Sequence, residues 1–253
     1  MKSYLFNYQT IVRFSQPITD HAVLLRCLPA KCLYQTVQEE HLIAAGRDRV
    51  LEGEDGFGNR VVQGYLGKPH SRWVYTCCGI VAQEPYLVER GNLPPEIFLA
   101  PSRLTTIKEK YETCRSGNVT EDAMGICRQV NGMLTYTPSA TTIETGVDEV
   151  MRTGRGVCQD YAHLMIALCR QRGIPARYAC GFVEGTGTTH AWVEIFNGQH
   201  WTGVDPTYNQ RIDYGYVKLA HGRDAADCPV NRGCYRNAAI EENEIIVTLE
   251  ELT

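Results

Sequence analysis

Residues 154–182 read GRGVCQDYAHLMIALCRQRGIPARYACGF, and this stretch decides the fold. Apolar side chains from Val157 to Leu168 recur every three to four residues, which is the period of one face of an α-helix. Gly173 and Pro175 then end the helix, because glycine favours the left-handed C-cap and proline cannot continue the hydrogen-bond ladder. The spacing predicts a buried helix.

The segments on either side of this helix carry different patterns. Before it, helix-capping residues predict helices over residues 102–115, 120–134 and 148–153. After it, polar and apolar residues alternate, which predicts strands over residues 177–183, 190–196, 200–205 and 244–249. Helices followed by an antiparallel sheet make an α+β fold.

The N-terminal third of the chain has no helical period. Polar and apolar side chains alternate in four segments, residues 4–14, 21–28, 61–66 and 72–81. We expect a small all-β sandwich there. Residues 91–102 contain three prolines and are the candidate linker. The sequence thus predicts a β-sandwich domain over residues 1–95 and a second domain, with helices packed on an antiparallel sheet, over residues 96–253.

Charge and hydropathy exclude several classes of protein. With 25 Lys and Arg against 29 Asp and Glu, the net charge is -4, so no basic excess neutralises a nucleic-acid backbone. The apolar runs are shorter than the ~18 to 20 residues of a membrane span, and residues 1–10 lack the apolar stretch of a signal peptide. We expect a cytoplasmic protein without nucleic-acid or membrane partners. Its oligomeric state stays open.

The cysteines do not form a disulfide framework or a metal-binding pattern. There are 11 of them, an odd number, and their spacing contains no C-x-x-C pair. We expect most to be free thiols in a reducing compartment. No acidic cluster has the spacing of a calcium loop, so neither a metal nor another cofactor is predicted.

One cysteine differs from the others by its position. Cys158 opens the predicted helix, where free backbone N–H groups and the helix dipole stabilise an anion. A thiolate is favoured there, and the same N–H groups can bind the oxyanion that forms on an attacked carbonyl. The alternative is a cysteine that only begins a core helix.

Two strands after this helix predict a partner for the thiol. THAWVEIF and QHWTGVD are joined by Asn-Gly at residues 197–198, which is typical of a two-residue hairpin turn. In that register His190 faces Asp205, and Gly203 faces Trp192 and leaves room for its indole. Asp205 then accepts a hydrogen bond from one ring nitrogen and directs the other toward the sulfur. The alternatives are a structural His-Asp pair or a β-bulge that separates the two side chains.

These residues also carry a resemblance to a known family. A cysteine that opens a helix, GIPAR after that helix, H-A-W on one strand and D-P-T on the next resemble the core of the transglutaminase-like superfamily, in its bacterial branch described as cysteine proteases. The likeness covers residues 100–250, and residues 1–90 are similar to the β-sandwich domain that precedes this core in bacterial members. It implies a papain-like fold in which Cys158 is the nucleophile, His190 the base and Asp205 the acid.

The sequence therefore predicts a cysteine-dependent acyl-transfer enzyme with a Cys-His-Asp triad. Its substrate would be a peptide or protein amide, cleaved through a thioester. The resemblance favours hydrolysis, as in a peptidase or amidase. A transglutaminase or other amine acyltransferase is the first alternative, because the triad does not select the acceptor. A catalytically silent binding module is the second.

His163, Tyr136 and residues 220–233 could also belong to the site. His163 is expected to be a solvated residue on the helix surface rather than a second base. Tyr136 is either an oxyanion donor or a packed aromatic residue. Residues 220–233 resemble a family segment that reads GRDYxDVxP, but Ala225 replaces the aromatic residue and Cys228 the valine. If that segment shapes the acceptor side of the cleft, substrate choice differs from the family norm.

Overall fold

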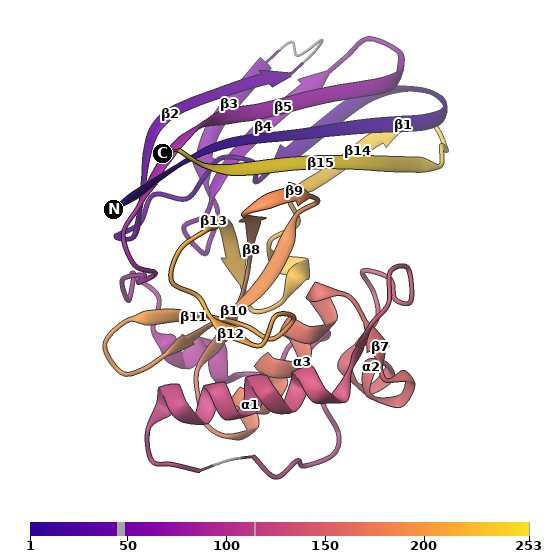
Figure 1. Cartoon of the computed structure of the whole chain (residues 1–253). Helices are drawn as coiled ribbons and strands as arrows, with labels where there is room; N and C mark the ends of the chain where they lie inside the picture. The colour runs from indigo at the N-terminus through magenta and orange to yellow at the C-terminus, as the bar shows by residue number, and fades with distance from the viewer. Residues whose placement is uncertain (45–48, 114, 253) are drawn as a thin grey trace.

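The computed structural model of the chain describes residues 1–44, 49–113 and 115–252. A β domain lies on one side of a second sheet, and helices cover the other side of that sheet (Figure 1). The predicted α+β fold is confirmed. Among the described residues no helix is long and apolar enough to cross a membrane.

The β domain is organised by one long strand, β1 (Lys2–Leu25). The first half of β1 pairs with β5 (His70–Gln83) and β15 (Glu241–Leu252), and the second half pairs with β4 (Arg60–Leu66) and β14 (Asn231–Arg236). The remaining strands are β2 (Gln35–Ala44), β3 (Arg49–Glu54) and β9 (Gly185–Gly187). The register of β1 against β5 shifts between Arg13 and Ile18, which bends β1. The strand therefore passes from its pairing with β5 and β15 to its pairing with β4 and β14, and the domain forms a half-barrel rather than two separate sheets.

Alternation along β1 decides which face is buried. Tyr4, Phe6 and Tyr8 are fully buried, whereas Leu5 between them is 43% exposed. Phe182, from the second sheet, joins this buried cluster and stacks on Phe6 with ring centroids 6.0 Å apart. The two parts of the molecule therefore share one hydrophobic core.

The C-terminal end of the chain, placed by the sequence in the second domain, pairs with strands of the β domain. Strands β14 and β15 follow the second sheet in sequence, yet both pair with β1 in the β domain. Alternation in residues 244–249 reveals a strand but does not identify its partner. Strand β15 also pairs with β9, which comes shortly before His190.

The second sheet is antiparallel, in the order β12-β11-β10-β8-β13. Its strands are β8 (Ala176–Val183), β10 (His190–Phe196), β11 (Trp201–Asp205), β12 (Gln210–Arg211) and β13 (Tyr216–Gly222). Side chains on alternate positions of β10 face the helices on one side and the β domain on the other.

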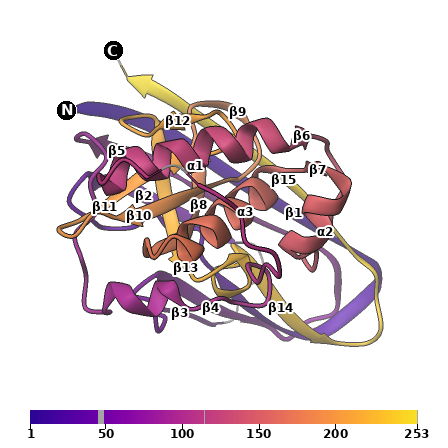
Figure 2. The same cartoon turned by 90° about the horizontal axis from the view of Figure 1, so that it is seen from below.

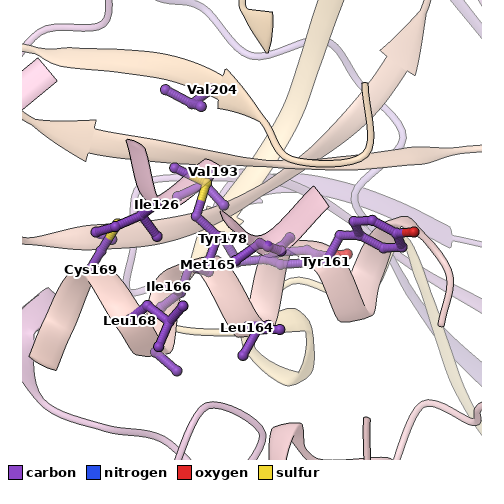
Figure 3. Packing of buried hydrophobic residues seen from close by; sticks show 14 of the residues in the cluster. Ile126, Tyr161, Leu164, Met165, Ile166, Leu168, Cys169, Tyr178, Val193 and Val204 are labelled. Carbon is purple, nitrogen blue, oxygen red and sulfur yellow. The ribbon is translucent and has the colours of Figure 1, made fainter. Parts of the chain in front are cut away.

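The described residues form three α-helices, namely α1 (Val119–Met133), α2 (Val147–Thr153) and α3 (Cys158–Gln171), which precede or cover this sheet. Short pieces complete the region, namely η1 (Pro95–Leu99), η2 (Ala225–Asp227), β6 (Thr135–Tyr136) and β7 (Arg155–Gly156). Figure 2 shows α1 and α3 in front of the sheet. Helix α3 is buried from Asp160 to Arg170, and its side chains lie among Ile126 of α1 and Val193 of the sheet (Figure 3).

The predicted helix over residues 102–115 is wrong. The described part of this segment forms turns and irregular structure, and residue 114 lies outside the described residues. Thr106 Oγ1 donates to the Ser102 carbonyl at 2.8 Å, and the Ser102 N–H donates to Thr105 Oγ1 at 3.1 Å. Side chains of this kind compete with the helical ladder for backbone groups, so a capping serine alone does not start a helix.

Truncation of the α3 core should be costly. Leu168 is fully buried, and Leu168→Ala should lower the free energy of unfolding by about 2–5 kcal/mol because it leaves a cavity. Leu33→Ala removes the same atoms at a site that is 65% exposed and should change it by less than about 0.5 kcal/mol. Urea unfolding of both variants checks this, and equal losses would contradict the packing described for α3.

Candidate active site

The sequence around Cys158 builds the start of α3. The backbone N–H of Val157 donates to Asp160 Oδ2 at 2.7 Å, and the Thr141 hydroxyl donates to the same oxygen at 2.6 Å. A Cβ on Gly156 would lie only 2.6 Å from the Asp160 Cβ, so that position requires glycine. Cys158 is thereby held as the first residue of α3, half-buried, where backbone N–H groups lack helical acceptors.

His190 and Asp205 form a buried hydrogen bond. His190 Nε2 lies 2.7 Å from Asp205 Oδ2, and the two residues are 8% and 0% exposed. Because Nε2 is engaged by the carboxylate, Nδ1 is the ring nitrogen left for another partner. The structure therefore brings these two predicted site residues together, while their catalytic role stays a prediction.

The predicted hairpin register is wrong by two residues. Phe196 pairs with Trp201 rather than with Gln199, so the turn spans four residues. The side-chain oxygen of Asn197 accepts the backbone N–H groups of Gln199 and His200, which favours this longer turn over a two-residue one. A shift of two residues keeps every side chain on its face. His190 and Asp205 thus still meet, as diagonal rather than direct neighbours.

The predicted role of Gly203 is also wrong. Gly203 pairs with Glu194, and a Cβ there would lie 3.0 Å from atoms of Ile212 and Tyr86. The glycine that makes room for the Trp192 indole is Gly181, where a Cβ would lie 3.0 Å from the ring. The sequence pattern indicated that a glycine is needed, but only the register shows which one.

Asp205 accepts four hydrogen bonds. Besides His190, its Oδ2 accepts the Tyr216 hydroxyl at 2.7 Å. Its Oδ1 accepts the backbone N–H groups of Thr207 at 2.7 Å and Tyr208 at 3.2 Å. These donors fix the carboxylate and leave it little freedom to rotate. Sequence reasoning missed Tyr216, because nothing in its local pattern indicates that a side chain of β13, which pairs with β8 at the edge of the sheet, reaches Asp205 of β11.

The environment of His190 favours its charged form. Burial alone would lower the pKa of the imidazole, but hydrogen bonds with Asp205 and Cys158, together with their negative charges, raise it to about 9. The ring also stacks on Tyr208 with centroids 5.2 Å apart and an interplanar angle of 17°. An imidazolium beside Cys158 is the arrangement that stabilises a thiolate.

Two exposed tyrosines stand near the thiol. Tyr136 is 51% exposed and Tyr208 is 57% exposed. Burial is the main cause that raises the pKa of each phenol, and the negative charge of Cys158 contributes in both cases. The Tyr136 ring also contacts Tyr161, with centroids 6.4 Å apart. The charge of Cys158 therefore acts on two aromatic side chains that solvent reaches.

The expectation that His163 is a solvated surface residue is wrong. It is 1% exposed, and its Nε2 accepts the backbone N–H of Ala225 at 3.1 Å. Burial lowers its pKa to about 4, so the ring is neutral at physiological pH. The segment with the altered family pattern therefore packs its backbone against α3. The predicted burial of the helix thus extends to the face that carries His163, which the apolar period does not mark.

No group of three or more His, Cys, Asp or Glu side chains is arranged to hold a metal ion within residues 1–44, 49–113 and 115–252. The site assembled above therefore consists of a half-buried thiol, an imidazole and a carboxylate, supported by tyrosines and backbone N–H groups. Such a set supplies a nucleophile, a proton carrier and a group that orients it.

Two family models match the chain. Residues 107–206 match the transglutaminase-like superfamily, and residues 4–82 match the bacterial transglutaminase-like N-terminal region. The resemblance noted from the sequence is thereby confirmed. Among solved structures, a "putative cysteine protease" from Cytophaga hutchinsonii has a TM-score of 0.79 at 23% identity, covering 100% of this chain and 91% of that chain. At this identity the likeness shows the fold.

Curated relatives extend these matches. An uncharacterized protein of Mycobacterium tuberculosis is 29% identical over 286 residues, which cover 96% of this chain and 90% of that protein. A protein-glutamine gamma-glutamyltransferase of Pseudomonas aeruginosa is 34% identical over 120 residues, which are 40% of this chain and 18% of that protein.

Replacing Asp205 should lower the pKa of His190. Asp205→Asn removes the negative charge that raises this pKa, while burial, which lowers it, remains. The pKa should fall well below 9, as measured by NMR titration of the imidazole. Asp213→Asn, at an exposed position, is the matched control and should leave the value unchanged.

The same shift predicts how stability depends on pH. A raised pKa in the folded state contributes stability that is complete below about 6.5 and is lost as the pH rises through about 9. The gap in Tm between the wild-type protein and Asp205→Asn should therefore be wider at about pH 6 than at about pH 10. A gap that does not vary with pH would contradict the assignment of this charge to His190.

Proposed function

Because the chain belongs to the transglutaminase-like superfamily and carries its bacterial N-terminal region, we propose that it is a cysteine-dependent acyl-transfer enzyme. Cys158 is the nucleophile, His190 the acid and base, and Asp205 the group that orients it. The observation that carries the proposal is the buried 2.7 Å hydrogen bond between His190 and Asp205, next to a half-buried thiol at a helix N-terminus. The preferred reaction is hydrolysis of a peptide or amide bond.

The proposed reaction has two halves. The Cys158 thiolate attacks the amide carbonyl carbon, and N–H groups in the first turn of α3 hold the oxyanion. The carbon–nitrogen bond then breaks, His190 gives its proton to the departing amine, and a thioester remains on Cys158. In the second half an acceptor attacks the thioester, His190 takes the acceptor's proton, and the thiolate is released.

The acceptor decides between hydrolysis and transfer. Water gives a peptidase or amidase, whereas a primary amine gives a transglutaminase. The protein from Cytophaga hutchinsonii, which shares the fold, is described as a "putative cysteine protease", in agreement with the first choice. The gamma-glutamyltransferase of Pseudomonas aeruginosa supports the second through 40% of this chain. We prefer hydrolysis, and the amine transferase is the second candidate.

The buried Asp205 carboxylate argues against a catalytically silent binding module. Asp205 is fully buried and accepts four hydrogen bonds, two of them from the side chains of His190 and Tyr216. A buried carboxylate that holds an imidazolium is costly unless every partner is in place. In the proposed reaction this carboxylate orients His190 for the proton transfers.

Alkylation should distinguish Cys158 from the other thiols. With iodoacetamide at neutral or slightly acid pH, Cys158 should react faster than the other cysteines, because an adjacent imidazolium stabilises its thiolate. Cys234 is the internal comparator, since it is exposed while Cys158 is only half-exposed. Peptide mass spectrometry measures the rates. If Cys158 reacts no faster than Cys234, access alone controls alkylation and the proposed activation is wrong.

Product analysis should identify the acceptor. Incubated with a glutamine-containing peptide, the protein should release free acid and ammonia, and an added primary amine should be incorporated to a smaller extent. Cys158→Ala should abolish both products without lowering the Tm, whereas Cys234→Ala should retain them. Amine incorporation that exceeds hydrolysis would overturn the preference for hydrolysis in favour of transfer.

A further inference from the structure

A cavity of about 670 Å³ lies between the β domain and the second sheet. Residues 52–60, which are the end of β3, the turn after it and the first residue of β4, form one wall. Residues 88–93, which lead into the linker, form another. Arg177 of β8 and Lys218 of β13 line it from the sheet, together with His221. Its lining does not include Cys158 or the His190–Asp205 pair.

Two of these lining residues belong to a buried ion cluster. Glu194 of β10 accepts hydrogen bonds from Arg177 Nε and, through both of its oxygens, from Lys218 Nζ at 2.8 Å. Its Oε1 also accepts the Tyr86 hydroxyl at 2.6 Å. Two cations therefore share one carboxylate whose acceptor positions are already used. The cluster carries a net charge of about +1 that no side chain within it balances.

The charged side chains of this cluster are buried. Arg177 is 4% exposed, Lys218 is 2% exposed and Glu194 is fully buried. Arg177 Nη2 is buried and has no hydrogen-bond partner among the described residues. The Trp201 ring covers the face of the guanidinium, 4.0 Å from its carbon, but a ring above that plane does not accept the in-plane N–H groups. A buried donor of this kind is expensive without an acceptor.

The positive charges of Lys218 and Arg177 also act on the imidazole of His221. Burial, followed by the positive charges of Lys218 and Arg177, holds the pKa of His221 well below its ordinary value. His221 is therefore neutral, and a neutral imidazole can donate one N–H. The sheet end of the cavity thus presents donors and positive charge, which disfavours a metal cation.

The rim of the cavity carries charges of both signs. Lys31 and Arg90 line it and form no ion pair within the part of the chain that the structure describes. Of the acids there, Asp55 pairs with Arg26 and Glu52 with Arg60. Glu89 accepts the Leu33 N–H, and neither Glu89 nor Glu54 forms an ion pair among the described residues, so the unpaired charges at the rim balance. The sheet end therefore determines the sign of the preferred ligand.

We propose that this cavity binds a small oxyanion, a carboxylate or a phosphate, whose oxygen accepts a hydrogen bond from Arg177 Nη2. The anion balances the charge that Arg177 and Lys218 leave over after pairing with Glu194. The site is separate from the proposed triad, and its occupancy does not depend on whether Cys158 is a nucleophile.

Titration calorimetry on the full-length protein tests this proposal. Sodium phosphate and sodium acetate are titrated in separate arms at constant ionic strength, which distinguishes the two sources of the oxyanion. Saturable binding with one site per chain is expected in at least one arm. Arg177→Gln should weaken it about tenfold or more, the factor expected for one charge-assisted hydrogen bond. Arg152→Gln, at an exposed arginine, should leave it unchanged.

A crystallographic measurement covers the case in which Arg177→Gln does not fold. Wild-type crystals are soaked in selenate, and the anomalous signal of selenium should place the oxyanion within hydrogen-bond distance of Arg177 Nη2. The absence of saturable binding in both arms would overturn the proposal. So would binding that Arg177→Gln does not weaken, or an anomalous peak that lies outside the cavity.

Discussion

The site depends on one buried carboxylate. Asp205 is removed from solvent, and it is held by two side-chain donors and two backbone N–H groups. This leaves the carboxylate a single orientation toward His190, so the imidazole is fixed by Nε2 and its other nitrogen is free for the thiol. The charge of Asp205 also helps to hold the pKa of His190 above its ordinary value, against the burial that would lower it.

The rest of the fold brings the thiol to that imidazole. Helix α3 is buried along most of its length, and the Asp160 carboxylate fixes the turn that places Cys158 at its start. His190 opens β10, and the chain just before it forms β9, which pairs with the C-terminal strand β15. The β domain therefore holds the segment that leads into the imidazole, and both ends of the chain contribute to the frame around the site.

The sequence predicted the parts that depend on local pattern. Helix α3, the strands β8, β10 and β11 and the contact between His190 and Asp205 were predicted, because period and face follow from neighbouring residues. Strands β12 and β13 of the same sheet were not predicted. The hairpin register was wrong by two, since Asn197 caps a longer turn, yet the contact survived because side chains repeat every two residues. Pairing between distant segments, as for Tyr216 or β15, leaves no local signal.

The most direct test of the account is the tautomer of His190 in the Cys158→Ala protein, measured by NMR on protein labelled with ¹⁵N-histidine. At a pH above the titration of the ring, the neutral imidazole should carry its proton on Nε2, hydrogen-bonded to Asp205, and leave Nδ1 unprotonated. A proton on Nδ1 with a bare Nε2 would contradict the account, because that ring could neither donate to the carboxylate nor accept a proton from the thiol side.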